Sequence, residues 1–156
     1  MSYGFLVMYL VSALTAPFEK WIAEDAVYII TSQERMEWVK LRTNAKRELF
    51  IAAFWSRRDP GFKDEHYRRV AYANEHFAVD KIPGWRTDRG RIYITLGPPD
   101  KIESHPSGDN YVRPPEEGGG SADVFPFELW HYKAKEAPLE FVDTTMSGNY
   151  RLVSDR

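Results

Sequence analysis

The chain has 156 residues, with 23 acidic and 21 basic side chains and a net charge of −2, a length that fits one ordinary domain. Hydrophobic residues make up 43% of the chain and aromatic residues 15%, which is enough to build a core and too much for a disordered protein. The balanced charge argues against binding to nucleic acid, and the absence of cysteine excludes disulfides, thiolate nucleophiles, zinc ribbons and iron–sulfur clusters.

Residues 1–16 form an apolar N-terminal segment, which we separate from a single domain over residues 17–156. Residues 4–16 carry no charge and the first charged side chain is Glu19, so this run is shorter than the roughly 20 residues that span a bilayer. It fits the hydrophobic part of a secretory signal, an interfacial anchor or a buried first helix. We expect an exported or membrane-attached protein of the periplasm or cell envelope, with residues 1–16 contacting the membrane if they are retained.

The pattern from Pro17 to Asp80 predicts helices. Thr31-Ser32-Gln33-Glu34 has the form of a capping box and predicts a helix from about Ser32 to Arg42. Thr43 predicts a second cap, opening a helix through Arg58 whose apolar stretch 49–55 we expect to be buried on nearly all sides.

A further helix is predicted from about Lys63 to Val79, after the Asp59-Pro60-Gly61 break. Its apolar stripe recurs at helical spacing and comprises Tyr67, Val70, Ala71, Asn74, Phe77 and Ala78. The neighbouring pairs Glu65-His66 and Glu75-His76 are then expected on the solvated face.

The second half of the chain predicts strands. Residues 91–96 alternate, with Ile92, Ile94 and Leu96 on one side, and residues 97–100 (Gly-Pro-Pro-Asp) end the run as a turn. Three more strands are predicted at residues 127–133, 139–142 and 150–153, after a Pro- and Gly-rich loop over residues 104–123. The fold class is therefore α+β, with three or four N-terminal helices packed on an antiparallel meander of about four strands.

Residues 82–91 (IPGWRTDRGR) hold the densest motif, at the junction of the two halves. Glycine permits positive φ, while threonine and aspartate side chains can cap neighbouring N–H groups. We therefore predict a rigid corner in which Trp85 anchors the turn and Asp88 pairs with an arginine. The motif residues are Gly84, Trp85, Thr87, Asp88 and Gly90.

The Gly-Trp-x-Thr-Asp string resembles the signature of the GWxTD domain family, found in envelope-associated and secreted bacterial proteins. The resemblance extends over several motifs in one order, from Lys20-Trp21 through Arg57-Arg58-Asp59-Pro60 and residues 66–77 to residues 125–130 and 141–143. It implies a protein of the envelope, and no activity or catalytic residue comes with it.

The candidates for chemistry are few. His66 and His76 are ten residues apart and do not share a helix face, so we expect no metal, and residues 118–120 (Gly-Gly-Gly) lack the Lys and Ser or Thr of a phosphate loop, so we expect no cofactor. One alternative stays open, a hydrolase or carbohydrate-active domain whose cleft gathers Asp88, His105, His131 and Asp143.

The preferred hypothesis is a non-catalytic interaction or structural module, an accessory subunit of a bacterial cell-envelope or membrane complex with a protein partner there and no nucleic acid. Aromatic and arginine side chains are the usual anchors of protein contacts. The long loop and the aromatics near it, which we expect to be exposed, supply the candidates Tyr111, Arg113, Phe125 and Trp130.

Overall fold

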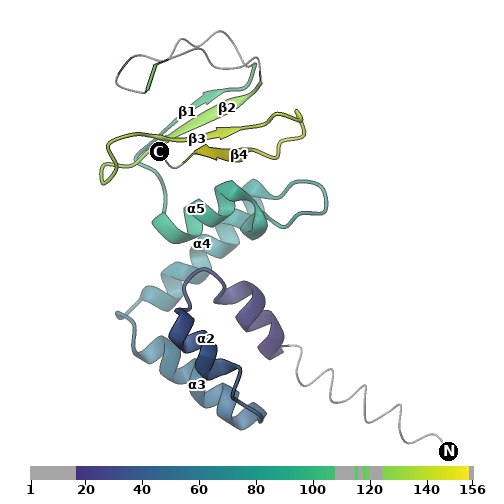
Figure 1. The fold of residues 1–156 in the computed structure, drawn as a ribbon, viewed down its shortest axis with the longest axis vertical. Helices are drawn as coiled ribbons and strands as arrows, with labels where there is room; N and C mark the ends of the chain where they lie inside the picture. The colour runs from purple at the N-terminus through teal and green to yellow at the C-terminus, as the bar shows by residue number, and fades with distance from the viewer. Residues whose placement is uncertain (1–16, 108–114, 116–117, 120–124, 155–156) are drawn as a thin grey trace, which may run out of the picture. The chain divides into compact units, whose positions relative to one another are not determined.

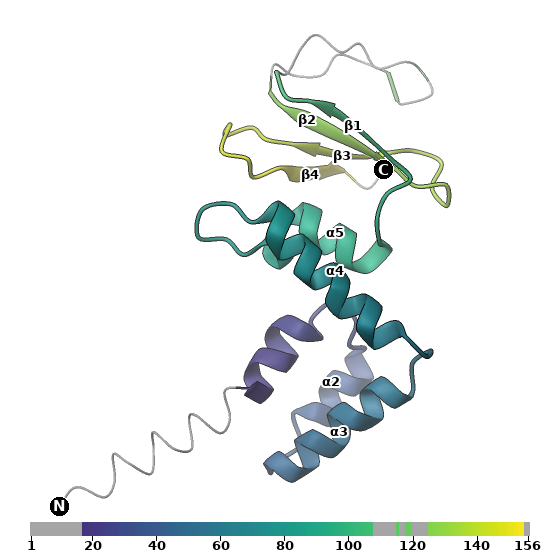
Figure 2. The same ribbon diagram turned by 180° about the vertical axis from the view of Figure 1, so that it is seen from behind.

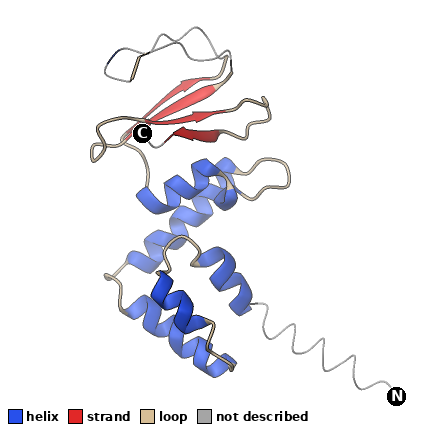
Figure 3. Cartoon of the chain, in the orientation of Figure 1, coloured by secondary structure: helices blue, strands red, loops and turns tan. Residues whose placement is uncertain are grey.

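The computed structural model describes residues 17–107, 115, 118–119 and 125–154, and these form the predicted α+β fold, with helices first and a four-stranded antiparallel sheet after them (Figures 1 and 3). The apolar segment 1–16 lies outside the described residues. No helix within the described ranges is long and apolar enough to cross a membrane. The chain comprises two compact units, unit 1 up to Arg68 and unit 2 from Arg69, so their boundary falls inside α4 (Phe62–Phe77).

Unit 1 contains a short π-helix, η1 (Trp21–Asp25), followed by α2 (Ser32–Trp38), α3 (Asn44–Ser56) and the first half of α4. Both predicted caps are confirmed. The Oγ1 of Thr31 accepts the N–H of Glu34 at 3.2 Å while Oε2 of Glu34 accepts the N–H of Thr31 at 3.0 Å, which completes the capping box of α2. Thr43 caps α3 by accepting the N–H of Lys46 at 3.3 Å.

An aromatic cluster forms the core of unit 1. The ring of Trp21 lies 5.0 Å from that of Trp38 and 5.0 Å from that of Phe54, the latter edge-on, and all three side chains are buried. The expectation that residues 49–55 are buried on nearly all sides is wrong, because Leu49 is 71% exposed. Phe50 and Phe54 are four residues apart and face the tryptophans, so α3 packs on one side and leaves the other to solvent.

The inner face of α4 differs from the predicted stripe by one position. Phe77 is buried as predicted, but Ala71 and Asn74 are exposed and Ala73, outside the predicted stripe, is buried. His66, expected on the solvated face, is only 3% exposed, and its Nε2 lies 2.6 Å from the backbone oxygen of Asp25 in unit 1. A buried imidazole that reaches a backbone partner in this way satisfies its hydrogen bonding inside the fold.

Unit 2 has two layers, a sheet and a layer of helical segments beneath it (Figures 1 and 2). The strands β1 (Lys101–His105), β2 (Phe127–His131), β3 (Leu139–Val142) and β4 (Arg151–Ser154) pair in chain order as an antiparallel meander. The second half of α4, the 3₁₀ helix η2 (Gly84–Arg86) and α5 (Asp88–Leu96) form the other layer. The ring of Trp130 on β2 packs 5.5 Å from Phe77 of α4 and 4.8 Å from Phe141 of β3, which joins the layers.

The predicted strand over residues 91–96 is wrong, because these residues belong to α5. Thr87 caps the helix, and Gly97, at φ 85°, ends it with its N–H bonded to the oxygen of Tyr93. Ile92 and Ile94 are both buried, because α5 is covered on more than one side. A helix that is buried on several sides can carry apolar residues at alternate positions, which is the pattern expected of a strand.

The four strands nevertheless match the predicted number, because β1 replaces the strand that is a helix. Sequence patterning missed β1, which lies at the edge of the sheet and is mostly exposed. Edge strands are commonly short and polar, so they lack the apolar alternation that predicts a strand. The remaining three predicted strands are confirmed as β2, β3 and β4.

Candidate functional site

Two glycines bring three backbone segments together at the Gly-Trp-Arg-Thr-Asp motif. A Cβ atom placed on Gly84 would lie 1.8 Å from the backbone oxygen of Ala73 in α4, and one placed on Gly90 would lie 1.9 Å from the oxygen of Gly84. Both distances are far inside van der Waals contact. Glycine is therefore required at both positions for α4, η2 and α5 to meet as they do.

Thr87 fixes the start of α5. Its buried Oγ1 accepts the N–H of Gly90 at 3.1 Å and donates its proton to the oxygen of Gly84 at 2.8 Å. One hydroxyl thus satisfies a free N–H at the helix N-terminus and a carbonyl of the preceding 3₁₀ turn.

Trp85 contributes a hydrogen bond through its backbone. Its N–H donates to Oδ1 of Asn74 on α4 at 3.0 Å, while its ring is half-buried with the guanidinium of Arg86 5.8 Å from the ring centroid. The predicted corner therefore exists, with Gly84, Thr87 and Gly90 buried in it and Trp85 half-buried.

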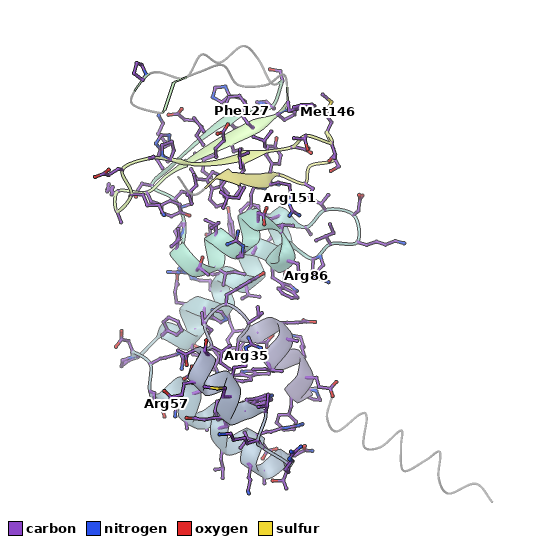
Figure 4. All side chains as sticks on the ribbon, viewed as in Figure 1. Arg35, Arg57, Arg86, Phe127, Met146 and Arg151 are labelled. Carbon is purple, nitrogen blue, oxygen red and sulfur yellow. The ribbon has the colours of Figure 1, made fainter. Side chains whose placement is uncertain are left out.

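Asp88 connects the motif to the last strand. Its Oδ2 accepts the backbone N–H of Leu152 at 3.0 Å and lies 3.1 Å from Nε of Arg151 on β4 (Figure 4). Its Oδ1 lies 3.7 Å from a guanidinium nitrogen of Arg91. The expected pairing of Asp88 with an arginine is thus confirmed, and its carboxylate is fully engaged inside the fold.

Arg89 forms a largely buried ion pair that sequence reasoning missed. Its Nη1 lies 3.0 Å from Oε1 of Glu128 on β2, and the two side chains are 13% and 14% exposed. The other guanidinium nitrogen donates to the oxygen of Gly148 at 3.0 Å, and Oε2 of Glu128 accepts the indole N–H of Trp130 at 2.9 Å. An arginine amid a structural motif was the only signal in the sequence, since its partner lies 39 residues away.

The constellation predicted for a hydrolase does not converge. His105 pairs with Phe127 and His131 pairs with Lys101, so the two histidines lie at opposite ends of the β1–β2 ladder. Four residues of strand separate these positions, which is about 13 Å at 3.3 Å per residue. The imidazole of His105 stacks on the ring of Phe127, with the centroids 4.3 Å apart, whereas His131 lies 3.3 Å from Oε1 of Glu103.

Asp143, the fourth member, has a structural role instead. Its buried carboxylate accepts the N–H groups of Gly148 at 2.6 Å and Ser147 at 3.2 Å, and the hydroxyl of Thr145 at 3.2 Å. Burial alone would raise the pKa of Asp143, but these hydrogen bonds outweigh it and lower the pKa. The carboxylate therefore stays ionised and holds the turn between β3 and β4.

The predicted interaction residues have different outcomes. Tyr111 and Arg113 lie outside the described residues. Phe125 is half-buried. Trp130, expected to be exposed, is fully buried between Phe77 and Phe141, so it is a core residue and not a docking anchor. Phe127 and Leu129 lie on one face of β2 and Trp130 lies on the other, and all three are buried. The alternating pattern of the strand predicts that only one face is buried, so it did not predict the burial of Trp130.

The described part of the chain holds no group of three or more histidine, aspartate or glutamate side chains placed to bind a metal ion. The polar residues of the motif instead bond to one another, to the backbone and to β2 and β4. What the geometry defines is a structural joint inside an α+β unit.

This joint carries the signature of a known family. The model of the GWxTD domain matches residues 17–142, which is most of the chain. The chain therefore belongs to the GWxTD domain family. Neither the curated proteins nor the solved structures give a match.

Proposed function

We propose that this chain is a non-catalytic interaction or structural module, an accessory subunit that binds a protein partner in a bacterial cell-envelope or membrane complex. The proposal places the protein in the periplasm or attached to the membrane. The docking residues are Tyr111 and Arg113 of the loop between β1 and β2, with Phe125 at its end.

The observation that supports this proposal is how the motif uses its polar groups. The hydroxyl of Thr87, the carboxylate of Asp88 and the guanidinium of Arg89 all bond inside unit 2. A catalytic motif needs groups aimed at a substrate position, whereas these groups hold helices and strands together. A scaffold of this kind suits a protein that presents a loop to a partner.

The hydrolase alternative lacks such support. A shared cleft needs its acid, base and nucleophile within hydrogen-bond reach of one reacting atom. His105 and His131 lie at opposite ends of a strand pair, and Asp143 is occupied by the β3–β4 turn.

Affinity purification from the native envelope tests the proposal. The wild type is compared with Tyr111→Ala/Arg113→Ala, and co-purifying proteins are identified by mass spectrometry. The matched control is Ile82→Ala/Arg86→Ala, which removes one apolar side chain and one arginine from exposed positions elsewhere in unit 2. We expect a stoichiometric partner that the loop variant loses and the control keeps, with unchanged melting temperatures for both.

Two results would overturn the proposal. If the wild type purifies without a stoichiometric partner, the chain is not an accessory subunit. If the loop variant melts well below the wild type and loses its partner together with its fold, Tyr111 and Arg113 are structural residues, and binding to the partner must use another surface.

A further inference from the structure

The end of the α2–α3 hairpin leaves large apolar side chains uncovered. We define the hairpin tip as residues 35–49, which comprise the last turn of α2, the connecting turn and the first turns of α3. In the tip, Met36 is 59% exposed, Val39 63% and Leu49 71%. The aromatic core of unit 1 takes Trp38 from the same segment and leaves these three outside.

The hairpin tip is also strongly basic. It carries two carboxylates, Glu37 and Glu48, and three more positive charges than negative ones, in a chain whose net charge is −2. Its five cations are Arg35, Lys40, Arg42, Lys46 and Arg47.

Four of these cations are not used by the fold. No described carboxylate forms an ion pair with Arg35, Lys40, Arg42 or Lys46, and all four are exposed. At the other end of α3 the cations form ion pairs, since Arg57 and Arg58 each lie 3.2 Å from Glu34. Arg57 and Arg58 are therefore structural, whereas the unpaired cations of the hairpin tip face the solvent.

Cations and apolar side chains alternate on the same helix faces. Arg35 and Val39 are four residues apart, and Lys46 and Leu49 are three apart, so each pair shares one face. The two helices meet at the tip, where the guanidinium of Arg47 lies 5.7 Å from the ring centroid of Trp38. Exposed apolar side chains bordered by lysine and arginine are the composition of segments that lie in the headgroup region of anionic membranes.

We propose that the hairpin tip binds the surface of a bilayer containing anionic phospholipids. Met36, Val39 and Leu49 enter the boundary between headgroups and acyl chains, while Lys40, Arg42 and Lys46 contact lipid phosphates. The inference rests on the proposed envelope location, but it concerns a different surface from the partner loop. The helical segment 17–25 starts toward the same end of unit 1 as the tip (Figures 1 and 2).

Co-sedimentation of the full chain with vesicles tests this inference. Vesicles of phosphatidylcholine alone are compared with vesicles of phosphatidylcholine and phosphatidylglycerol in equal parts. We expect preferential binding to the anionic vesicles, and the variant K40Q/R42Q/K46Q to bind them about 100-fold more weakly, since each basic residue near such a surface contributes about fivefold. Residues 1–16 are the same in all variants, so differences among them report the hairpin tip.

The matched control is K81Q/R86Q/K133Q, which removes the same charge from exposed positions of unit 2. Equal losses for the two triple variants, or equal binding of the wild type to both kinds of vesicle, would overturn the proposal. So would a tip variant that binds vesicles normally and loses a co-purifying protein. If the tip variant does not fold, a salt titration of the wild type decides, because binding to lipid phosphates must weaken as salt screens the charges.

Failure here and failure of the proposed function are distinguishable. Loss of the protein partner in the loop variant leaves vesicle binding unchanged if both proposals hold. Vesicle binding without preference for anionic lipid overturns only the hairpin proposal, and leaves the partner result standing.

Discussion

Gly84 lies so close to α4 that a single added carbon would stand 1.8 Å from the backbone oxygen of Ala73. The first letter of the family signature is therefore a packing requirement. The oxygen that this carbon would meet belongs to the backbone, which cannot move aside as the end of a flexible side chain does. The glycine of the signature thus fixes how closely η2 and α4 approach each other.

Gly84→Ala is expected to destabilise unit 2 by about 3 kcal/mol or more, because the new methyl group overlaps a backbone carbonyl. Chemical denaturation followed by circular dichroism measures the loss. Ala71→Ser adds one atom at an exposed position of α4 and is the control, with a change of less than about 0.5 kcal/mol. A Gly84→Ala protein as stable as the wild type would contradict the close approach of η2 to α4.

Thr87→Ala removes the N-cap of α5 and the hydrogen bond to Gly84. We expect a loss of about 1–2 kcal/mol in the free energy of unfolding. Thr87→Ser keeps the hydroxyl and should recover most of it, whereas Thr144→Ala, at an exposed position, should change little. Equal losses for the alanine and serine variants would show that the methyl group, and not the cap, stabilises the corner.

Arg89→Gln leaves the carboxylate of Glu128 buried beside Trp130 without its cation. The expected loss is about 3–5 kcal/mol, because an uncompensated buried charge is costly. The double variant Arg89→Gln/Glu128→Gln should regain part of it, since two neutral amides can bond to each other. Thermal melts of the two variants measure the difference, and a double variant less stable than the single one would rule out this explanation.

Glu34 makes unit 1 sensitive to acid. Burial would raise its pKa, but the Arg58 guanidinium and the Thr31 N–H outweigh burial and lower the pKa from 4.5 to about 2. A lowered pKa means that the unfolded chain binds the proton more tightly, so this contribution is complete above about pH 5 and is lost as the pH falls from there toward 2. It amounts to about 2–3 kcal/mol, the carboxylate being 13% exposed.

Denaturation curves between pH 5 and pH 2 check this dependence. Glu34→Gln should be less stable at neutral pH and should lose little more on acidification, so the two curves converge near pH 2. Glu37→Gln, at an exposed position of the same helix, is the control and should follow the wild type. Parallel curves for Glu34→Gln and the wild type would assign the acid sensitivity to another group.

Helix caps were predictable from the sequence, because the capping side chain bonds to a residue only three positions away. Thr31 with Glu34 and Thr43 with Lys46 are caps that span three residues, so sequence spacing alone defines them. Strands β2 and β3 were predictable because each carries β-branched or aromatic residues in a short run. The α+β class followed from the order of these elements.

Tertiary burial was not predictable in the same way. Residues 92–96 alternate as a strand does, but the cap at Thr87 and the stop at Gly97 make them a helix. The side chains of Leu49 and Trp130 were assigned to the wrong environment, because hydrophobicity says that a residue can be buried and not which side of its element is covered. The partner of Arg89 could not be found either, since a separation of 39 residues leaves no local trace.

The bond from Asp88 to the N–H of Leu152 spans 64 positions of the chain. In unit 1, the hydrogen bonds between Asp25 and the side chains of His66 and Tyr67 span 41 and 42 positions. During synthesis, unit 1 can close these contacts once residue 68 has emerged, whereas Oδ2 of Asp88 in α5 lacks its partners until β4 has emerged. Folding of unit 2 therefore depends on the arrival of β4, and a chain interrupted before β4 exposes the inner face of its sheet to chaperones and proteases.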